Sequence, residues 1–181
     1  MMIAFLANSI GKWLLKKGVE KSKRVPEAIH ISEMNSGLLV FDINTESRYQ
    51  EILAFQKKLK VEAISQISLL GFTLEKELPS FINEEQVQVL GKKDLSLWGI
   101  PKDEFHQQLM KKDYDLMIDC TENMEVPTDY IMALVQAKTK VGKPNPENEY
   151  IFDLLIDGSK EEGVDAFSKN VIHFLKMINR K

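Results

Sequence analysis

Short, nearly continuous apolar runs separated by amphipathic segments constrain the fold of this chain most strongly. The two clearest runs are residues 38–43, LLVFDI, and residues 114–120, YDLMIDC. A strand with one solvent-exposed face would alternate apolar and polar residues. These runs do not alternate, so they predict strands that are covered on both faces. Strands of that kind belong to sheets that carry helices on each side.

The rest of the chain continues this alternation. Further strands are predicted over 66–73, 87–90, 138–142 and 150–156, and helices over 46–60, 101–111, 127–137 and 161–179. The pattern predicts a three-layer α/β/α, Rossmann-like fold with a mostly parallel sheet of about five to six strands. Because the loop before 150–156 is short, the last strand is the one for which an antiparallel direction is considered.

Composition narrows the class of protein. The chain has 181 residues, enough for one domain, with 44% hydrophobic and 28% charged residues. Cys120 is the only cysteine, so no internal disulfide forms, which fits a reducing compartment. No apolar run is long enough to predict a transmembrane segment. The apolar start MMIAFLANSIG lacks the basic n-region of a signal peptide, and lysines follow it instead, so no export signal is predicted. We therefore expect a cytoplasmic protein.

The first 24 residues differ in charge from the rest. They contain six basic residues against Glu20, a net charge of +5, whereas the whole chain has −3. Their apolar residues follow helical spacing, which predicts a basic amphipathic helix over 1–24 added to a single α/β domain over 25–181. The residues expected at a partner or membrane surface are Lys12, Trp13, Lys16, Lys17, Lys21 and Arg24.

Two interpretations of this helix stay open. Basic amphipathic helices lie on anionic membranes or contact the phosphates of RNA. Alternatively the apolar stripe docks on the chain's own domain, on a protein partner or on a second copy in a homodimer, and the lysines remain solvated.

A ligand site in an open α/β sheet lies beyond the carboxyl ends of the strands. The polar residues expected there are Asp42, Asn44, Asp119, Thr121, Glu122, Asn123 and Lys143. If the strands 38–43 and 114–120 are neighbours, Asp42 and Asp119 approach each other, and paired carboxylates can bind a divalent cation or act as acid and base. The competing interpretation is that these residues cap helices and bind loop backbone.

Other motifs for chemistry are missing from the sequence. No two of His30, His106 and His173 have the spacing of metal ligands, so no metal site is predicted. Cys120 follows an apolar strand and is expected to be buried. Neither GxGxxG nor GxxxxGK[ST] occurs, so no nucleotide or other cofactor is predicted.

Two resemblances extend this picture. The stretch YDLMIDCTEN…ALVQAKTKVG, over 114–142, resembles the end of the N-terminal half of bacterial heptosyltransferases. The chain departs from those enzymes after its first strand, where FDINTES replaces their glycine-rich turn with its acidic base, and it has no room for their second domain. The whole chain resembles a family of small uncharacterised proteins from Bacteroidetes bacteria, through KKDLSLWGIP, YDLMIDCTEN, AKTKVGK and FLKMINRK. That resemblance implies the fold and no known activity.

The leading hypothesis is therefore a non-enzymatic α/β binding or interaction module whose basic N-terminal helix contacts a protein or an anionic partner. The alternative is a small-molecule-binding protein or enzyme with its site at the carboxyl ends of the first and fourth strands.

Overall fold

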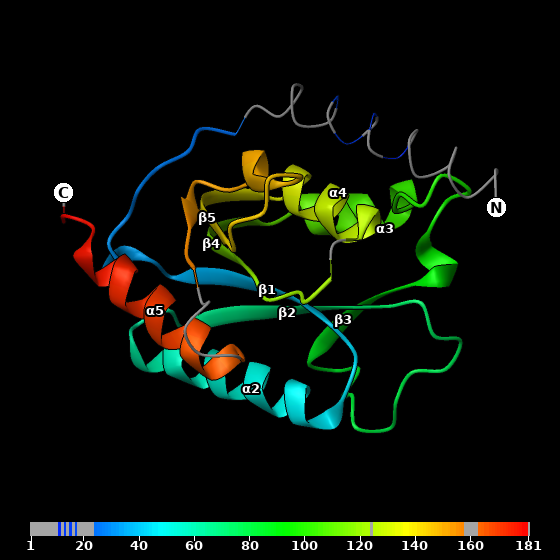
Figure 1. The fold of residues 1–181 in the computed structure, drawn as a ribbon, viewed down its shortest axis with the longest axis horizontal. Coiled ribbons are helices and arrows are strands. Elements are labelled where there is room, and N and C mark those ends of the chain that lie inside the picture. The colour runs from blue at the N-terminus through cyan, green and yellow to red at the C-terminus, as the bar shows by residue number, and fades with distance from the viewer. Residues whose placement is uncertain are drawn as a thin grey trace.

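The centre of the molecule in the computed structural model is a parallel sheet (Figure 1). The structure describes Gly11, Trp13, Leu15, Lys17 and residues 24–123, 125–157 and 163–180. Within these residues one sheet contains six strands in the order β3-β2-β1-β4-β5-β6, and every pair is parallel. The strands are β1 (Ser36–Asp42), β2 (Gln66–Thr73), β3 (Val87–Gly91), β4 (Asp113–Asp119), β5 (Gln136–Gly142) and β6 (Leu154–Leu155).

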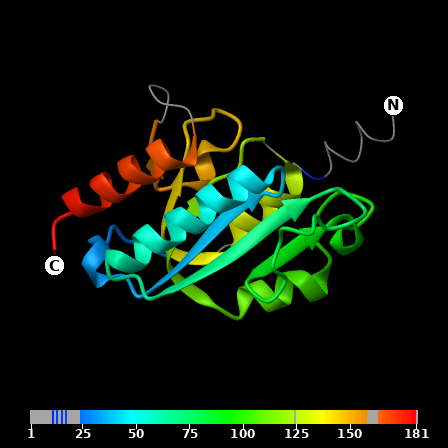
Figure 2. The same ribbon diagram turned by 90° about the horizontal axis from the view of Figure 1, so that it is seen from below.

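Helices cover both faces of this sheet (Figures 1 and 2). One face carries α2 (Glu46–Val61) and α5 (Val164–Met177), and the other carries α3 (Asp103–Met110) and α4 (Val126–Leu134). Three short 3-10 turns complete the described elements: η1 (Ile31–Glu33), η2 (Lys92–Asp94) and η3 (Glu149–Ile151). The predicted three-layer α/β/α architecture is confirmed.

The central strand β1 shows why its sequence lacks polar alternation. Leu39 and Phe41 belong to the hydrophobic cluster on the α2 and α5 side. Leu38 and Val40 belong to the cluster on the opposite side. Because successive side chains of a strand point to opposite faces, a strand buried on both sides must be apolar at every position in its middle.

The last strand corrects one expectation. The predicted strand over 150–156 is reduced to β6, preceded by η3, and it pairs with β5 in parallel, so the antiparallel direction considered from the sequence is wrong. The pairing involves only Val141 with Leu154 and Gly142 with Leu155, at the carboxyl end of β5. The segment after β5 therefore does not need to run back to the amino end of the sheet before it pairs, and a short connection between β5 and β6 is sufficient.

The end of α4 depends on a buried lysine that the sequence did not indicate. The Lys140 side chain on β5 is 1% exposed, and its Nζ donates to the carbonyls of Met132 at 2.6 Å and Ala133 at 2.9 Å. These carbonyls lack intrahelical donors because the helix ends there. Burial lowers the pKa of the Lys140 ammonium to about 7, and the nearby charge of Arg24 acts in the same direction.

Among the described helices, none combines the length and the apolar composition needed to cross a bilayer.

Candidate functional site

The carboxyl ends of β1 and β4 meet at the centre of the sheet. Asp42 and Asp119 are the last residues of these neighbouring strands, and they are 5% and 6% exposed. The structure thus brings together the two carboxylates that the sequence singled out. The negative charge of Asp42 contributes to raising the pKa of Asp119, although burial is the larger cause.

Asp42 holds the loop that follows β4. Its Oδ2 accepts hydrogen bonds from the backbone N–H of Glu122 at 2.7 Å and of Asn123 at 3.2 Å. A carboxylate that accepts two N–H groups of an adjacent loop performs the role of a cap.

Asp119 is bound to the same loop. Its Oδ1 accepts from the backbone N–H of Thr121 at 2.8 Å and from the Thr121 hydroxyl at 2.7 Å. Burial raises the pKa of Asp119, while these two hydrogen bonds and the charge of Lys143 oppose that rise. Lys143 is itself engaged, since its Nζ donates to the Thr121 carbonyl at 3.0 Å.

Arg48 is a member of this cluster that sequence reasoning missed. It lies in the first turn of α2, which Thr45 caps by accepting the Arg48 backbone N–H. Its guanidinium donates to the Cys120 carbonyl at 2.7 Å and pairs with the Glu122 carboxylate at 2.9 Å. The Asn44 amide donates to the other oxygen of Glu122 at 3.0 Å. The signal available in the sequence was the spacing of Arg48, which places it on the apolar side of the predicted helix together with Ile52 and Phe55.

The strand-end cluster therefore consists of residues that bind one another: Asp42, Asn44, Arg48, Asp119, Thr121, Glu122, Asn123 and Lys143. Across the described parts of the chain, no group of three His, Cys, Asp or Glu side chains is arranged to hold a metal ion. Cys120 is fully buried, as expected, and burial raises the pKa of its thiol to about 12. A thiol with so high a pKa is protonated at neutral pH and is a poor nucleophile.

The described residues of the N-terminal helix lie on two sides of it. Leu15 is 3% exposed and belongs to the cluster that packs under α3 and α4. A Cβ added at Gly11 would lie 2.8 Å from Val126 Cγ1, so the helix backbone approaches the domain closely there. Trp13 is 54% exposed, and the exposed Lys17 places its Nζ 3.9 Å from the centroid of the Trp13 ring.

Of the other basic residues expected at the partner surface, Arg24 lies within the described residues. Arg24 is tied to the domain, because its guanidinium donates to the carbonyls of Ala137 and Lys138 and pairs with Asp153. Lys12, Lys16 and Lys21 lie outside the described residues.

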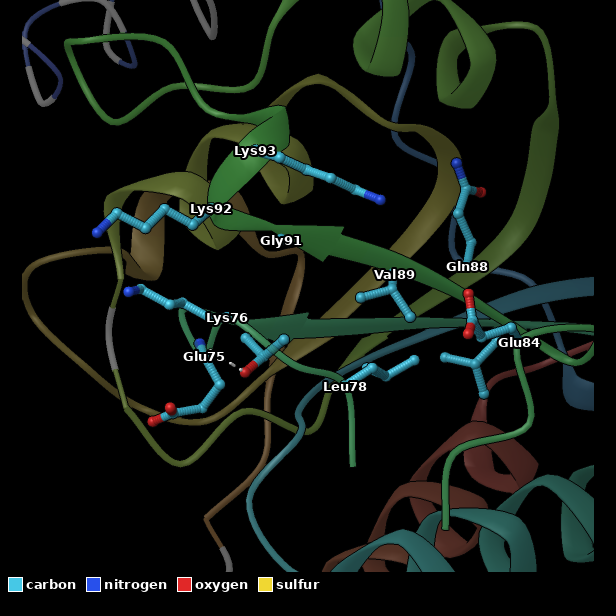
Figure 3. Close-up of a pocket in the computed structure, with 11 residues that line it drawn as sticks. Glu75, Lys76, Leu78, Glu84, Gln88, Val89, Gly91, Lys92 and Lys93 are labelled. Atoms are coloured by element: carbon cyan, nitrogen blue, oxygen red, sulfur yellow. Dashed lines mark hydrogen bonds between the residues drawn. The ribbon is translucent and has the colours of Figure 1, made fainter. Parts of the chain in front are cut away.

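A hollow lies at the ends of β2 and β3, a region that the sequence had not singled out. Its volume is about 530 Å³. Figure 3 shows the side chains that line it. Its lining residues come from the ends of the two strands and from the connection between them: Thr73, Glu75, Lys76, Leu78, Glu84, Val87, Gln88, Val89, Gly91, Lys92 and Lys93. We call this hollow the edge pocket, because β3 is the edge strand of the sheet.

The order and direction of the strands define a doubly wound, Rossmann-like α/β domain. The chain belongs to a family of unknown function, DUF6913, whose model matches residues 8–178. No curated protein matches the chain.

Two solved structures of E. coli heptosyltransferase WaaC are similar to it. With the structure containing ADP, the identity is 14% and the TM-score 0.48, over 78% of this chain and 46% of the enzyme. With the structure containing ADP-2-deoxy-2-fluoro heptose, the identity is 16% and the TM-score 0.48, over 80% of this chain and 50% of the enzyme. The chain thus spans about half the length of these enzymes, and the likeness expected from its sequence is found at low identity.

Proposed function

We propose that this protein is a non-enzymatic α/β interaction module that contacts an anionic partner through the outward side of its N-terminal helix. The observation that carries the proposal is the exposed pair of Trp13 and Lys17 on a helix whose other side is buried through Leu15. An apolar stripe docked on the domain leaves the cationic side free for a partner.

The chemistry of this pair favours a layer of anionic phospholipid headgroups over RNA. Tryptophan is enriched at the membrane interface, where its ring lies at headgroup depth beside basic residues. Each lysine near an anionic surface contributes about 1 kcal/mol of attraction, roughly fivefold in affinity. The positive net charge of residues 1–24 is consistent with such a surface.

The strand-end cluster supports the non-enzymatic part of the proposal. An acid, a base or a metal ligand must be free to meet a substrate, whereas Asp42 and Asp119 each accept two hydrogen bonds from the loop after β4. We place the module in the cytoplasm, because the lone buried thiol of Cys120 is in keeping with a reducing compartment.

Co-sedimentation of the full chain with phospholipid vesicles tests the proposal. We expect binding to vesicles that contain phosphatidylserine, little binding to phosphatidylcholine alone, and a loss of binding as salt is added. Lys17→Glu should weaken binding at least fivefold. Lys60→Glu, an equal charge change on the exposed side of α2, should leave binding largely intact.

Substitutions are a sharper test than removal of residues 1–24. Removal would also uncover the hydrophobic cluster around Leu15, so a loss of binding would have two explanations. Trp13→Ala removes a largely exposed ring and its contact with Lys17, and it should weaken vesicle binding. Binding to single-stranded RNA without binding to the vesicles would contradict the choice of partner, and equal effects of Lys17→Glu and Lys60→Glu would contradict the choice of surface.

A further inference from the structure

The edge pocket has the position and size of a small-molecule site. It opens at the carboxyl ends of β2 and β3, the end of a parallel sheet where ligands bind in α/β proteins. Its volume of about 530 Å³ falls within the range of roughly 300–1,000 Å³ that is typical of ligand sites. In the strand-end cluster, at the end of the neighbouring β1, most polar groups are already bound to one another or to loop backbone, although Arg48 Nε has no hydrogen-bond partner among the described residues.

The floor of the pocket is apolar. Val87 is buried, and Val89 and Leu78 are partly buried against the cluster on the α2 side. In Figure 3, Leu78 and Val89 lie in the middle of the hollow, between its two polar ends. No helix covers this part of the sheet face, because the connection 74–86 from β2 to β3 contains none in the described structure. Apolar side chains remain accessible here because nothing packs over them completely.

One end of the pocket is cationic. Lys76 and Lys92 extend in the same direction from the ends of the two strands, with the Glu75 side chain below them, and Lys93 lines the hollow but extends the opposite way, toward Gln88 (Figure 3). Across the described residues, no carboxylate or carbonyl binds the ammonium group of any of these three lysines, although Glu75 and Glu84 line the same pocket. An ammonium without an internal partner is available to an anion.

The groove between α2 and α5 shows the opposite arrangement. It has a similar volume, about 520 Å³, and several lysines line it. Three of its four lysines have carboxylate partners there: Lys58 and Lys169 both pair with Asp165, and Lys176 pairs with Glu62 at 2.7 Å. Lysines that already have carboxylate partners offer less to a ligand, so the edge pocket is the stronger anion site.

We propose that the edge pocket binds a small organic anion, with its phosphate or carboxylate group against Lys76 and Lys92 and its apolar body on Leu78, Val87 and Val89. The anion supplies the partner that these lysines lack, and the body covers the apolar floor. This site is separate from the N-terminal helix, and its failure would leave the proposed function untouched.

Titration of the isotopically labelled full chain by NMR tests this proposal. Phenyl phosphate and benzoate carry the same apolar ring on two different head groups, and inorganic phosphate carries the head group alone. We expect at least one of the two ring-bearing anions to saturate at millimolar concentration and to shift the backbone amides of Val89, Gly91 and Lys92. Inorganic phosphate should bind at least tenfold more weakly, because it has no apolar group to pack against Leu78, Val87 and Val89.

Matched variants separate a site from general attraction to charge. Lys76→Glu combined with Lys92→Glu should weaken binding at least tenfold. Lys57→Glu combined with Lys169→Glu, which changes the net charge equally at the α2 and α5 groove, should change it less than twofold. Val89→Thr, a change of similar shape on a partly buried side chain, should weaken the ring-bearing anion and leave inorganic phosphate unchanged.

Three results would overturn the proposal. The first is the absence of saturation with both ring-bearing anions. The second is equal affinity for inorganic phosphate and phenyl phosphate, which would show that the apolar side chains of the pocket do not contribute to binding. The third is equal weakening by the two pairs of lysine substitutions, which would reduce the effect to net charge. The fold of every variant is checked by circular dichroism and thermal unfolding.

Discussion

Two regions at the same end of the sheet differ in how their polar side chains are used. At the ends of β1 and β4, carboxylates, an arginine, an amide and a lysine bind one another and the adjacent loop. At the ends of β2 and β3, three lysines line a hollow of about 530 Å³, and none of their ammonium groups has a partner among the described residues. Both regions lie beyond the carboxyl ends of strands, and the second offers more charged groups without a partner, because Arg48 Nε is the one buried side-chain atom of the first cluster that lacks a hydrogen bond within the described structure.

The difference teaches that position in an α/β fold is a weak indicator of function by itself. The central strand ends are also where loops are anchored, because the N–H groups of a loop at the edge of the buried interior need acceptors. Asp42 and Asp119 supply those acceptors, so their burial and proximity have a structural explanation. The edge pocket has no comparable structural demand on its lysines.

The largest expected effect comes from removing the anchor at β1. Asp42→Ala leaves the N–H groups of Glu122 and Asn123 without their acceptor, and it should lower the free energy of unfolding by about 3 kcal/mol. Asp42→Asn, which keeps one acceptor oxygen, should lose less. Urea denaturation measures both, and Glu84→Ala in the edge pocket is the control. A loss below about 0.5 kcal/mol for Asp42→Ala would remove the contrast between the two regions.

The buried Lys140 provides a second comparison, between an engaged lysine and free ones. Its lowered pKa means that the unfolded chain binds the proton more readily above about pH 7, so stability should rise with pH there. The gain should be about 1.4 kcal/mol per pH unit at most, or on the order of 2 kcal/mol between about pH 7 and pH 9. Lys140→Met should abolish this dependence in urea denaturation, and a persistent slope in the variant would assign it to another group.

A smaller effect is expected at Asp119. Burial raises its pKa in the folded state, so the folded chain retains the proton to higher pH and stability falls as pH rises from the ordinary carboxyl pKa to the raised one. Asp119→Asn keeps the Oδ1 that accepts from Thr121 and carries no charge. The variant should therefore be at least as stable as the wild type at neutral pH and lack that fall, as thermal unfolding at acidic and neutral pH would show. Marked destabilisation at neutral pH would mean that the negative charge itself is needed.

The smallest effect is expected in the edge pocket. Lys76→Ala combined with Lys92→Ala removes no interaction within the described structure, so the free energy of unfolding should change by less than about 0.5 kcal/mol. Thermal unfolding without added ligand measures this. A loss as large as that of Asp42→Ala would show that these lysines stabilise the fold and would make the two regions alike.

Much of the fold was predictable because its signals are local. The runs over 38–43 and 114–120 indicated strands buried on both faces, and β1 and β4 occupy the centre of the sheet. The direction of β6 was not predictable, because its two residues pair only with the end of β5. Lys140 was missed because its partners are helix-end carbonyls, which leave no mark in the pattern of side chains. Arg48 lies on the apolar side of the predicted helix, but the Cys120 carbonyl that it binds is 72 positions away along the chain.

The sequence by itself determined that this chain alternates strands with helices, that its interior strands end in Asp42 and Asp119, and that its first 24 residues are basic. Those properties depend on residue types and on neighbours a few positions apart. Only the tertiary structure decided which polar groups have partners, since the loop that Asp42 holds lies 80 positions away along the chain. Whether a charged side chain anchors the fold or remains available to a ligand is a property of such distant contacts, because a buried polar group must be satisfied by whatever the fold brings beside it.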